Sequence, residues 1–208
     1  MSKYEDARGA ARDIERIRAL MERATEFSNL SGWSILISGA LAVAGVAACR
    51  YAGVDFREEV SRNGEYGPAG AALGPIWGSV FVLAVVQGMA FSVANARRKA
   101  EPFWSPLTRQ VVVAMLPALF TGATLTEYAL RSGRLEILPP CWMLAYGSSL
   151  MGLGLFAGRA FRVAALAFLV FGALSLFLLR SHGLIMMLVS FGGLHLLLGA
   201  WVLWKRRA

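Results

Sequence analysis

The sequence predicts an all-α membrane protein: a six-transmembrane-helix bundle preceded by a cytoplasmic amphipathic helix. The composition supports this class, because the 208 residues are 57% hydrophobic and only 16% charged, whereas a typical soluble domain has about 25% charged residues. The apolar residues also form long uncharged runs, each close to the ~20 residues that a helix needs to cross a bilayer. The alternating segments of about ten residues that mark a transmembrane β-barrel do not occur in the sequence.

The breaks between the apolar runs are polar, charged or rich in proline. NARRKAEPFWSP, at 95–106, has a basic cluster and two prolines, and RSGRLEILPP, at 131–140, is charged before it ends in prolines. Charges are costly within a spanning helix, and clustered prolines mark turns, so these segments separate the spans. A transmembrane domain is therefore expected over 30–208, with spans at about 31–51, 71–94, 109–130, 138–157, 162–179 and 184–203.

The distribution of Lys and Arg predicts the orientation. In the six-span arrangement, segments on the side of the two termini hold 15 Lys and Arg residues, and segments on the opposite side hold 6. Basic residues accumulate in cytoplasmic segments of membrane proteins. We therefore expect a multi-pass protein of the bacterial inner (cytoplasmic) membrane with both termini in the cytoplasm.

Residues 1–29 are expected to form a cytoplasmic amphipathic helix. Six acids and six bases balance over this segment, whereas helices that lie on lipid usually have a cationic polar face. The helix therefore has three interpretations: it folds back on its own bundle, it docks a second copy or a cytoplasmic protein through residues 1–28, or it lies on the bilayer. Apolar residues spaced three and four apart form the candidate docking face: Ile14, Ile17, Leu20, Met21, Ala24 and Phe27.

Five polar side chains are expected near the middle of the bilayer. Such groups are costly in lipid and often functional. His195, within FGGLHLLLGAW at 191–201, is expected to point into the bundle and to form a hydrogen bond with another helix, because lipid satisfies neither ring nitrogen. It is interpreted as a structural histidine, a solute or proton site, or a cofactor ligand. The candidate polar layer consists of His195, Gln87, Thr121, Ser148 and Ser149.

Cofactor and metal chemistry find little support in the sequence. Haem held by two histidines needs both imidazoles at similar depth. His182 is 13 residues from His195, which places it roughly 17–20 Å away along a helix axis. Glu127, the only carboxylate expected within a span, lies near a span end. No motif for phosphate binding, nucleophilic catalysis or zinc is present, so no catalytic residue, cofactor, metal or nucleic-acid partner is predicted.

Two cysteines fall at expected span ends on the outer side. Cys49 ends the first span and Cys141 begins the fourth. They could form a disulfide if those spans are neighbours and the Cα atoms lie within about 7 Å. Alternatively, both are small buried hydrophobic side chains.

Several stretches resemble an uncharacterised group of short multi-span bacterial inner-membrane proteins. They are EPFWSPLTRQ at 101–110, PPCWMLAYGSSLMGLGLFAGR at 139–159 and FGGLHLLLGAW at 191–201, preceded by IERIRALMERATEFSNLSGWS at 14–34. The resemblance covers most of the chain. It implies a bacterial inner-membrane location and no assigned activity, so it identifies no catalytic residue.

The sequence therefore predicts a non-enzymatic integral membrane protein. The first hypothesis is an accessory, sensory or interaction subunit that docks a partner through its N-terminal helix. The second is a small-solute or proton transporter with a midplane polar site around His195. The third is a membrane redox protein.

Overall fold

The structure is a computed structural model that describes residues 31–54, 56 and 70–205. All regular secondary structure in these residues is helical, and no strand occurs among them. The protein is therefore all-α in its described part. The amphipathic helix predicted over residues 1–29, with its docking face, lies outside the described residues.

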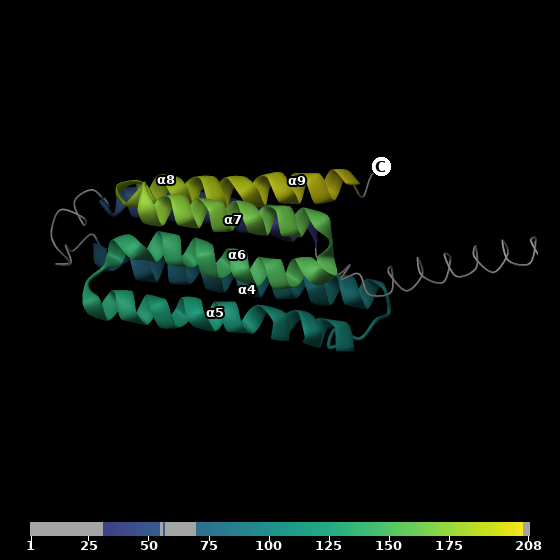
Figure 1. Cartoon of the computed structure of the whole chain (residues 1–208). Helices are drawn as coiled ribbons and strands as arrows, with labels where there is room; N and C mark the ends of the chain where they lie inside the picture. Colours follow the sequence, from purple (N-terminus) through teal and green to yellow (C-terminus); the bar gives the residue numbers. More distant parts are fainter. Residues whose placement is uncertain (1–30, 55, 57–69, 206–208) are drawn as a thin grey trace, which may run out of the picture.

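The helices run side by side along one axis (Figure 1). From α4 onward the connections between the long helices are short, and each long helix overlaps one of the ranges expected from hydropathy. The 3₁₀ turns η1 (Gly70–Ala72), η2 (Leu135–Ile137) and η3 (Arg180–His182) precede α4, α6 and α8. The long elements are α2 (Gly32–Tyr51), α4 (Leu73–Arg98), α5 (Pro106–Ser132), α6 (Leu138–Ala157), α7 (Arg159–Phe177) and a continuous run of α8 (Gly183–Met187), η4 (Leu188–Leu194) and α9 (His195–Lys205).

Local sequence signals set the ends of α5. The Ser105 side chain accepts a hydrogen bond of 3.1 Å from the Thr108 backbone N–H, and Pro106 is the first residue of the helix. Both are favoured at helix starts, where backbone N–H groups have no partner within the helix. At the other end Gly133 has φ 70°, the left-handed conformation that glycine adopts readily.

Five helical segments are long and apolar enough to cross a membrane. They are α2, α4, α5, α7 and the run Arg180–Lys205. The helix α6 has 20 residues and is not among these five segments. It lies between α5 and α7 and packs against both. The fourth expected span, at 138–157, is thus a long helix between α5 and α7 that length and composition do not mark as membrane-spanning.

Glycine allows α2 to pack directly on α9. A Cβ atom added to Gly199 would lie 2.8 Å from the Leu36 backbone nitrogen and 2.9 Å from the Gly32 carbonyl oxygen. A Cβ on Gly39 would lie 3.0 Å from the Leu196 nitrogen. Small residues permit this close approach of helix backbones in membranes. The contact fixes α2 against the helical run that carries His195.

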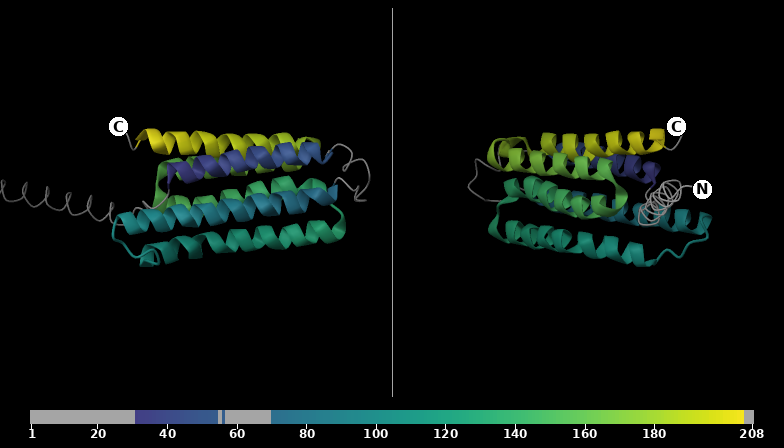
Figure 2. Two further views of the ribbon diagram at one scale, coloured as in Figure 1. Left: turned by 180° about the vertical axis from the view of Figure 1, so that it is seen from behind. Right: turned by 45° about the vertical axis from the view of Figure 1, so that its right-hand side comes forward.

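The helix α4 has little support from the rest of the bundle. It packs against α2, whereas α5 packs against α6, and α4 and α5 make little contact with each other among the described residues. Seen from behind in Figure 2, α4 runs between α2 and α5. Half of the residues of α4 are exposed, and only Leu73, Trp77 and Ala96 are buried. This arrangement leaves space between α4 and α5.

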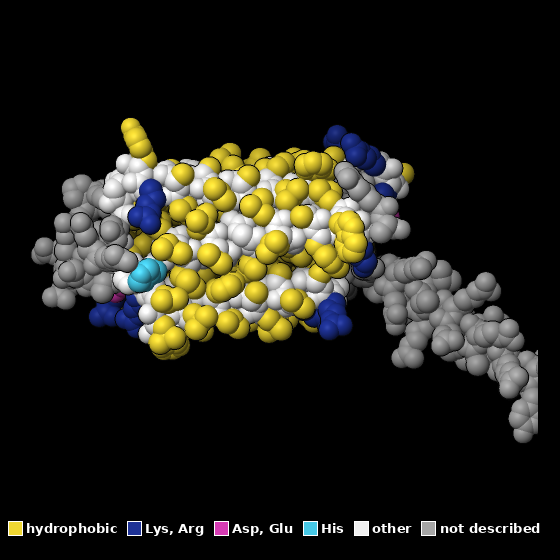
Figure 3. Space-filling model, turned by 90° about the horizontal axis from the view of Figure 1, so that it is seen from above, with side chains coloured by type: hydrophobic (Ala, Val, Ile, Leu, Met, Phe, Trp, Pro, Cys, Tyr) yellow, Lys and Arg dark blue, Asp and Glu magenta, His cyan; other side chains and the backbone are white. Residues whose placement is uncertain are grey.

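On the outer surface, apolar residues lie along the middle of the bundle and basic residues lie at its ends. In Figure 3 hydrophobic side chains cover the middle of the visible face, and Lys and Arg side chains lie at its two ends. The exposed apolar residues include Phe81, Phe120, Leu155 and Phe177, which are 55%, 74%, 69% and 74% exposed. A soluble protein rarely exposes so much contiguous apolar surface.

Candidate functional site

His195, the first residue of α9, is buried where α6 and the α8–α9 run meet. Its side chain is 8% exposed, and its Nε2 atom lies 2.8 Å from the Tyr146 hydroxyl oxygen. The inter-helix hydrogen bond predicted for His195 is therefore present. Its partner on α6 is Tyr146, which was not among the predicted residues.

The hydrogen bond between Tyr146 and His195 uses only one of the two donors that these side chains carry. A phenol has one O–H and a neutral imidazole has one N–H, and the bond between them uses one of the two. The backbone carbonyl of Phe191 also interacts with the ring. However, Nδ1 has no partner with hydrogen-bond geometry among the described residues. Nδ1 itself is buried, so the contact of the ring with the Phe191 carbonyl lies inside the protein.

A π-helical segment, η4 (Leu188–Leu194), immediately precedes His195. A π-helix has a wider turn than an α-helix. Such segments are rare overall, and those that occur are often found at functional sites. The wider turn changes the direction in which the residues that follow project. It therefore contributes to the placement of His195 against Tyr146.

Aromatic rings surround the pair. Phe191 lies at the centre of this cluster, with its ring centroid 5.5 Å from that of Tyr146, 5.1 Å from that of Phe168 and 5.7 Å from that of Trp77. Trp142 continues the cluster from Trp77 at 6.0 Å. Ring pairs at these separations attract one another beyond simple area burial. The cluster forms an aromatic wall that joins α4, α6, α7 and η4.

A cavity of about 750 Å³ opens against this wall. Its size falls within the roughly 300–1,000 Å³ that small-molecule sites occupy. Residues of α4 and α5 form its two sides, α6 and η4 form its back, and the lining includes exposed residues such as Phe81 and Ala123. It therefore opens to the surface between α4 and α5. His195, Tyr146, Trp77, Trp142, Phe191, Ser38 and Thr126 also line it.

The cavity lining carries little charge. Glu127 is its single ionisable carboxylate, and this side chain forms an exposed ion pair with Arg131 one turn along α5. Thr126 accepts a hydrogen bond of 2.8 Å from the Trp142 indole N–H. By contrast, the buried Nε1 of Trp77 has no hydrogen-bond partner among the described residues. The Cys49 sulfur interacts with this indole, but a thiol sulfur is a weak acceptor.

The other four candidate polar residues do not form one site with His195. Gln87 donates through Nε2 to the Ser34 carbonyl at 3.1 Å and to the Ser38 hydroxyl at 2.7 Å, and so fastens α4 to α2. Thr121 is exposed and donates to the Pro117 carbonyl of its own helix. Ser148 is exposed, and Ser149 is fully buried without a partner among the described residues. The predicted layer thus divides into separate local contacts.

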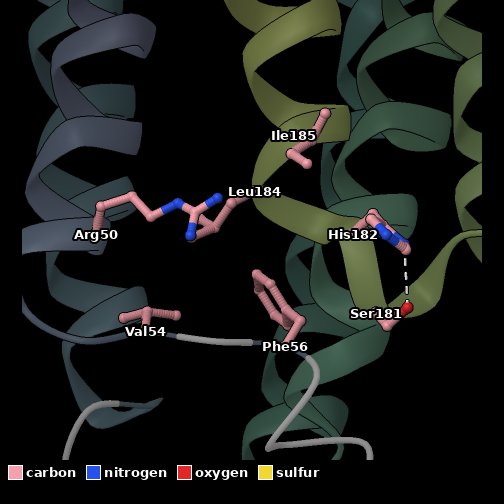
Figure 4. Close-up of a pocket in the computed structure, with 7 residues that line it drawn as sticks. All are labelled: Arg50, Val54, Phe56, Ser181, His182, Leu184 and Ile185. Carbon is pink, nitrogen blue, oxygen red and sulfur yellow. Dashed lines mark hydrogen bonds between the residues drawn. The ribbon is translucent and has the colours of Figure 1, made fainter.

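The second histidine lines a different, smaller cavity. This space, about 150 Å³, lies at the end of the bundle where α2 ends (Figure 4). Arg50 extends across it from α2, and Ser181 Oγ lies 3.0 Å from His182 Nδ1.

Cys49 and Cys141 are both free thiols. No disulfide joins α2 to α6.

Two of the residues that define the cavity were missed by the sequence analysis. Tyr146 lies two residues before Ser148, within the same uncharged run, but only inter-helix packing identifies it as the partner of His195. Trp77 lies early in the second expected span and was not among the predicted site residues. Its position in the cavity depends on the rotation of α4. A hydroxyl-bearing aromatic residue deep in an apolar run is the signal that points to Tyr146.

No protein-family model matches this chain, and neither a curated protein nor a solved structure matches it at a significant level.

Proposed function

We propose that this chain is a non-enzymatic, multi-pass membrane protein that binds a small, mainly apolar molecule in the cavity between α4 and α5. The observation that carries the proposal is the cavity itself: about 750 Å³, mostly apolar, open on the lipid-facing side and backed by the Tyr146–His195 pair. Ligand sites combine an apolar lining with a few polar groups that orient the ligand. This proposal develops the second hypothesis from the sequence, a solute site around His195.

The proposed topology has six spans, with α6 as the fourth, in a bacterial inner membrane and with both termini cytoplasmic. The apolar middle of the bundle and its basic ends support a transmembrane position. Four described basic residues lie at the opposite end from the C-terminus: Arg50, Arg131, Arg134 and Arg180. Seven lie at the end with the C-terminus: Arg97, Arg98, Lys99, Arg109, Arg159, Arg162 and Lys205.

Binding from the lipid phase fits the shape of the site better than passage of a water-soluble solute. The lining is dominated by Ala, Gly, Val, Leu, Phe and Trp side chains, and its opening lies between two helices rather than at a bundle end. An apolar molecule dissolved in the bilayer can enter such an opening without crossing a charged rim. A polar solute would lose its hydration without replacement partners.

The proposal is tested by identifying what the protein retains on purification. Full-length protein is extracted in mild detergent, and bound lipophilic molecules are quantified by mass spectrometry after solvent extraction. Gly78→Phe fills the cavity, because a Cβ on Gly78 meets nothing within 4 Å and Gly78 lines the cavity. Val86→Phe is the matched control, since Val86 is an exposed α4 residue outside the lining.

We expect wild type and Val86→Phe to retain one lipophilic compound at near-stoichiometric amount, above the level of bulk lipid. The Gly78→Phe protein should lose it while still unfolding in one cooperative transition, at a midpoint lowered by the loss of the ligand. Equal lipid profiles in all three proteins would rule out this function.

The docking of a partner by the N-terminal helix remains a separate proposal. Its candidate face falls outside the described residues, so it rests on the 3.6-residue pattern and on the balanced charge of residues 1–29. A second copy and a cytoplasmic protein are its two candidate partners.

A further inference from the structure

We infer that the ligand of this cavity is a single-chain cationic amphiphile, a hydrocarbon chain that carries an ammonium group at one end. The inference rests on the proposed function, because it specifies the class of molecule that the cavity takes. Three features of the lining carry it: the length of the cavity along the helices, the position of its one carboxylate, and a partly exposed tryptophan beside that carboxylate.

The cavity runs along the helices from one end of the bundle toward the middle. Its lining extends from Gly74 to Val85 on α4 and from Leu119 to Leu130 on α5. Each range corresponds to a helical rise of about 16 Å. The start of α4 and the end of α5 lie at the same end of the bundle (Figure 2). Because about 16 Å is half of the ~30 Å hydrocarbon thickness of a bilayer, the cavity has the length of a lipid chain in one leaflet.

The long sides of the cavity are apolar and have open space. Phe81, Ala84 and Ala123 line them, and a Cβ atom added to Gly74 or Gly78 would meet nothing within 4 Å. The α4 backbone is therefore uncovered where these two glycines line the cavity. A hydrocarbon chain can lie in this elongated space without leaving a polar group unsatisfied.

The carboxylate of the lining lies near the end of the cavity, three residues before Leu130. Among the described residues that line the cavity, Glu127 is the only acid, and none is Lys or Arg. Arg131 binds Oε1 of Glu127, but the two side chains are 58% and 81% exposed, and exposed ion pairs at this spacing contribute little to stability. An ammonium group can therefore share or replace this partner, whereas an anionic head group would meet a like charge.

An indole ring lies beside this carboxylate. The Trp142 N–H donates a hydrogen bond of 2.8 Å to the hydroxyl of Thr126, which precedes Glu127 on α5. Trp142 lines the cavity and is only partly buried, so part of its surface is accessible. Tryptophan rings attract cations, and quaternary ammonium ligands are recognised in this way. The carboxylate and the indole ring together favour a cationic head group over a neutral one of the same shape.

The test compares three probes with the same hydrocarbon chain. Tetradecyltrimethylammonium is the cation, the alkane in which a carbon atom replaces its nitrogen is the neutral probe, and tetradecyl sulfonate is the anion. Each radiolabelled probe is titrated into full-length protein in dodecyl maltoside, a neutral detergent. Kd is expressed as the mole fraction of probe in the micelles, and the readout is the ratio of the affinities for the cation and the alkane.

Five variants locate the two ends of the ligand. Glu127→Gln removes the charge, and Trp142→Leu removes the ring. Arg131→Gln removes the competing partner of the carboxylate. Glu136→Gln is the matched control, because it removes an acid at the same end of the bundle, in η2, that does not line the cavity. Gly78→Phe fills the cavity.

We expect wild type to bind the cation about threefold to tenfold more tightly than the alkane, and to bind the sulfonate more weakly than either. Glu127→Gln and Trp142→Leu should each reduce the ratio of cation to alkane affinity toward one. Arg131→Gln should raise this ratio by about twofold, and Glu136→Gln should leave it unchanged. Gly78→Phe should prevent binding of all three probes, and alkane binding by the other variants shows that they are folded.

The outcomes separate this inference from the proposed function. Equal affinities for the cation and the alkane, a preference for the sulfonate, or a ratio unchanged by Glu127→Gln would overturn the cationic class while leaving an apolar binding site. An equal loss of the ratio in Glu136→Gln would also overturn it, because the preference would then reflect the charge of the bundle end. Binding of all probes that is indifferent to Gly78→Phe would overturn the site itself.

Discussion

The Tyr146 hydroxyl and the His195 imidazole join α6 to α9 through a hydrogen bond of 2.8 Å between residues 49 apart in sequence. Both side chains line the cavity between α4 and α5. The bond therefore has a structural effect, which holds two helices together, and a positional effect, which fixes the Tyr146 and His195 side chains in the lining of the cavity. The two effects can be measured separately.

A double-mutant cycle of Tyr146→Phe and His195→Leu should give a coupling free energy near 0.6 kcal/mol and no larger than about 1.7 kcal/mol, the range found for hydrogen bonds between membrane helices. The measurement is the unfolding free energy of each single variant and of the double variant in mixed micelles. All three should still fold, because one such bond is a small part of the stability of the bundle. A coupling of zero would mean that the bond contributes nothing to stability.

The helix positions could be predicted because composition changes sharply along the chain. Runs without charge are bounded by segments such as RSGRLEILPP at 131–140, and the ~20-residue requirement leaves little freedom in dividing the chain. α6 shows the limit of this reasoning. It is not among the five helices that length and apolar composition mark as able to cross a membrane, although it lies between α5 and α7 and packs against both.

The site was predicted less well than the helices. Counting residues along a span gives the depth of a side chain in the bilayer, but it does not give the direction in which that side chain points. His195, Gln87 and Ser149 were placed near one level, but each helix rotation decides which neighbour a side chain meets. The π-helical segment η4 changes the rotation just before His195, and the hydropathy pattern contains no sign of it. The cavity follows from the weak contact between α4 and α5, a property of tertiary packing.

The close approach of α2 and α9 should make Gly199→Ala destabilising. A Cβ there would meet backbone atoms at 2.8–2.9 Å, so the helices must move apart. Overpacking of this kind costs about 1–3 kcal/mol. Gly78→Ala is the control, because its Cβ meets nothing within 4 Å. Unfolding free energies should fall for Gly199→Ala and stay level or rise slightly for Gly78→Ala. An equal response at both positions would contradict the glycine contact.

Gln87 should determine how firmly α4 stays on α2. Its amide donates to the Ser34 carbonyl and the Ser38 hydroxyl, and α4 has few other contacts. Gln87→Leu should therefore increase hydrogen exchange along α4 more than along α6. Val86→Leu, at the adjacent exposed position, should leave the exchange pattern unchanged. If hydrogen exchange along α4 is the same in wild type and in both variants, contacts other than those of Gln87 hold α4 in place.

The proposed topology predicts which loops are accessible from outside the cell. In a chain with Cys49 and Cys141 replaced by alanine, Arg134→Cys should react with a membrane-impermeant maleimide in intact cells, because it lies between α5 and α6 on the outer side. Glu101→Cys, between α4 and α5, should react only after the membrane is opened. Both positions are exposed, so accessibility depends on sidedness alone. Reaction of both in intact cells would exclude this topology.

The proposed role of the N-terminal helix predicts that its apolar face, rather than its charge, holds a partner. Full-length protein and a variant with Ile17→Asp and Leu20→Asp are each cross-linked in cells and purified. Only wild type should form a specific adduct, because an acidic side chain on the predicted apolar face prevents helix-in-groove packing. A control variant, Arg12→Asp, changes charge by the same sign off that face and should keep the adduct. The mass of the adduct identifies the partner: twice the chain for a second copy, any other value for a different protein. The same adduct in the face variant as in wild type would exclude docking through this face.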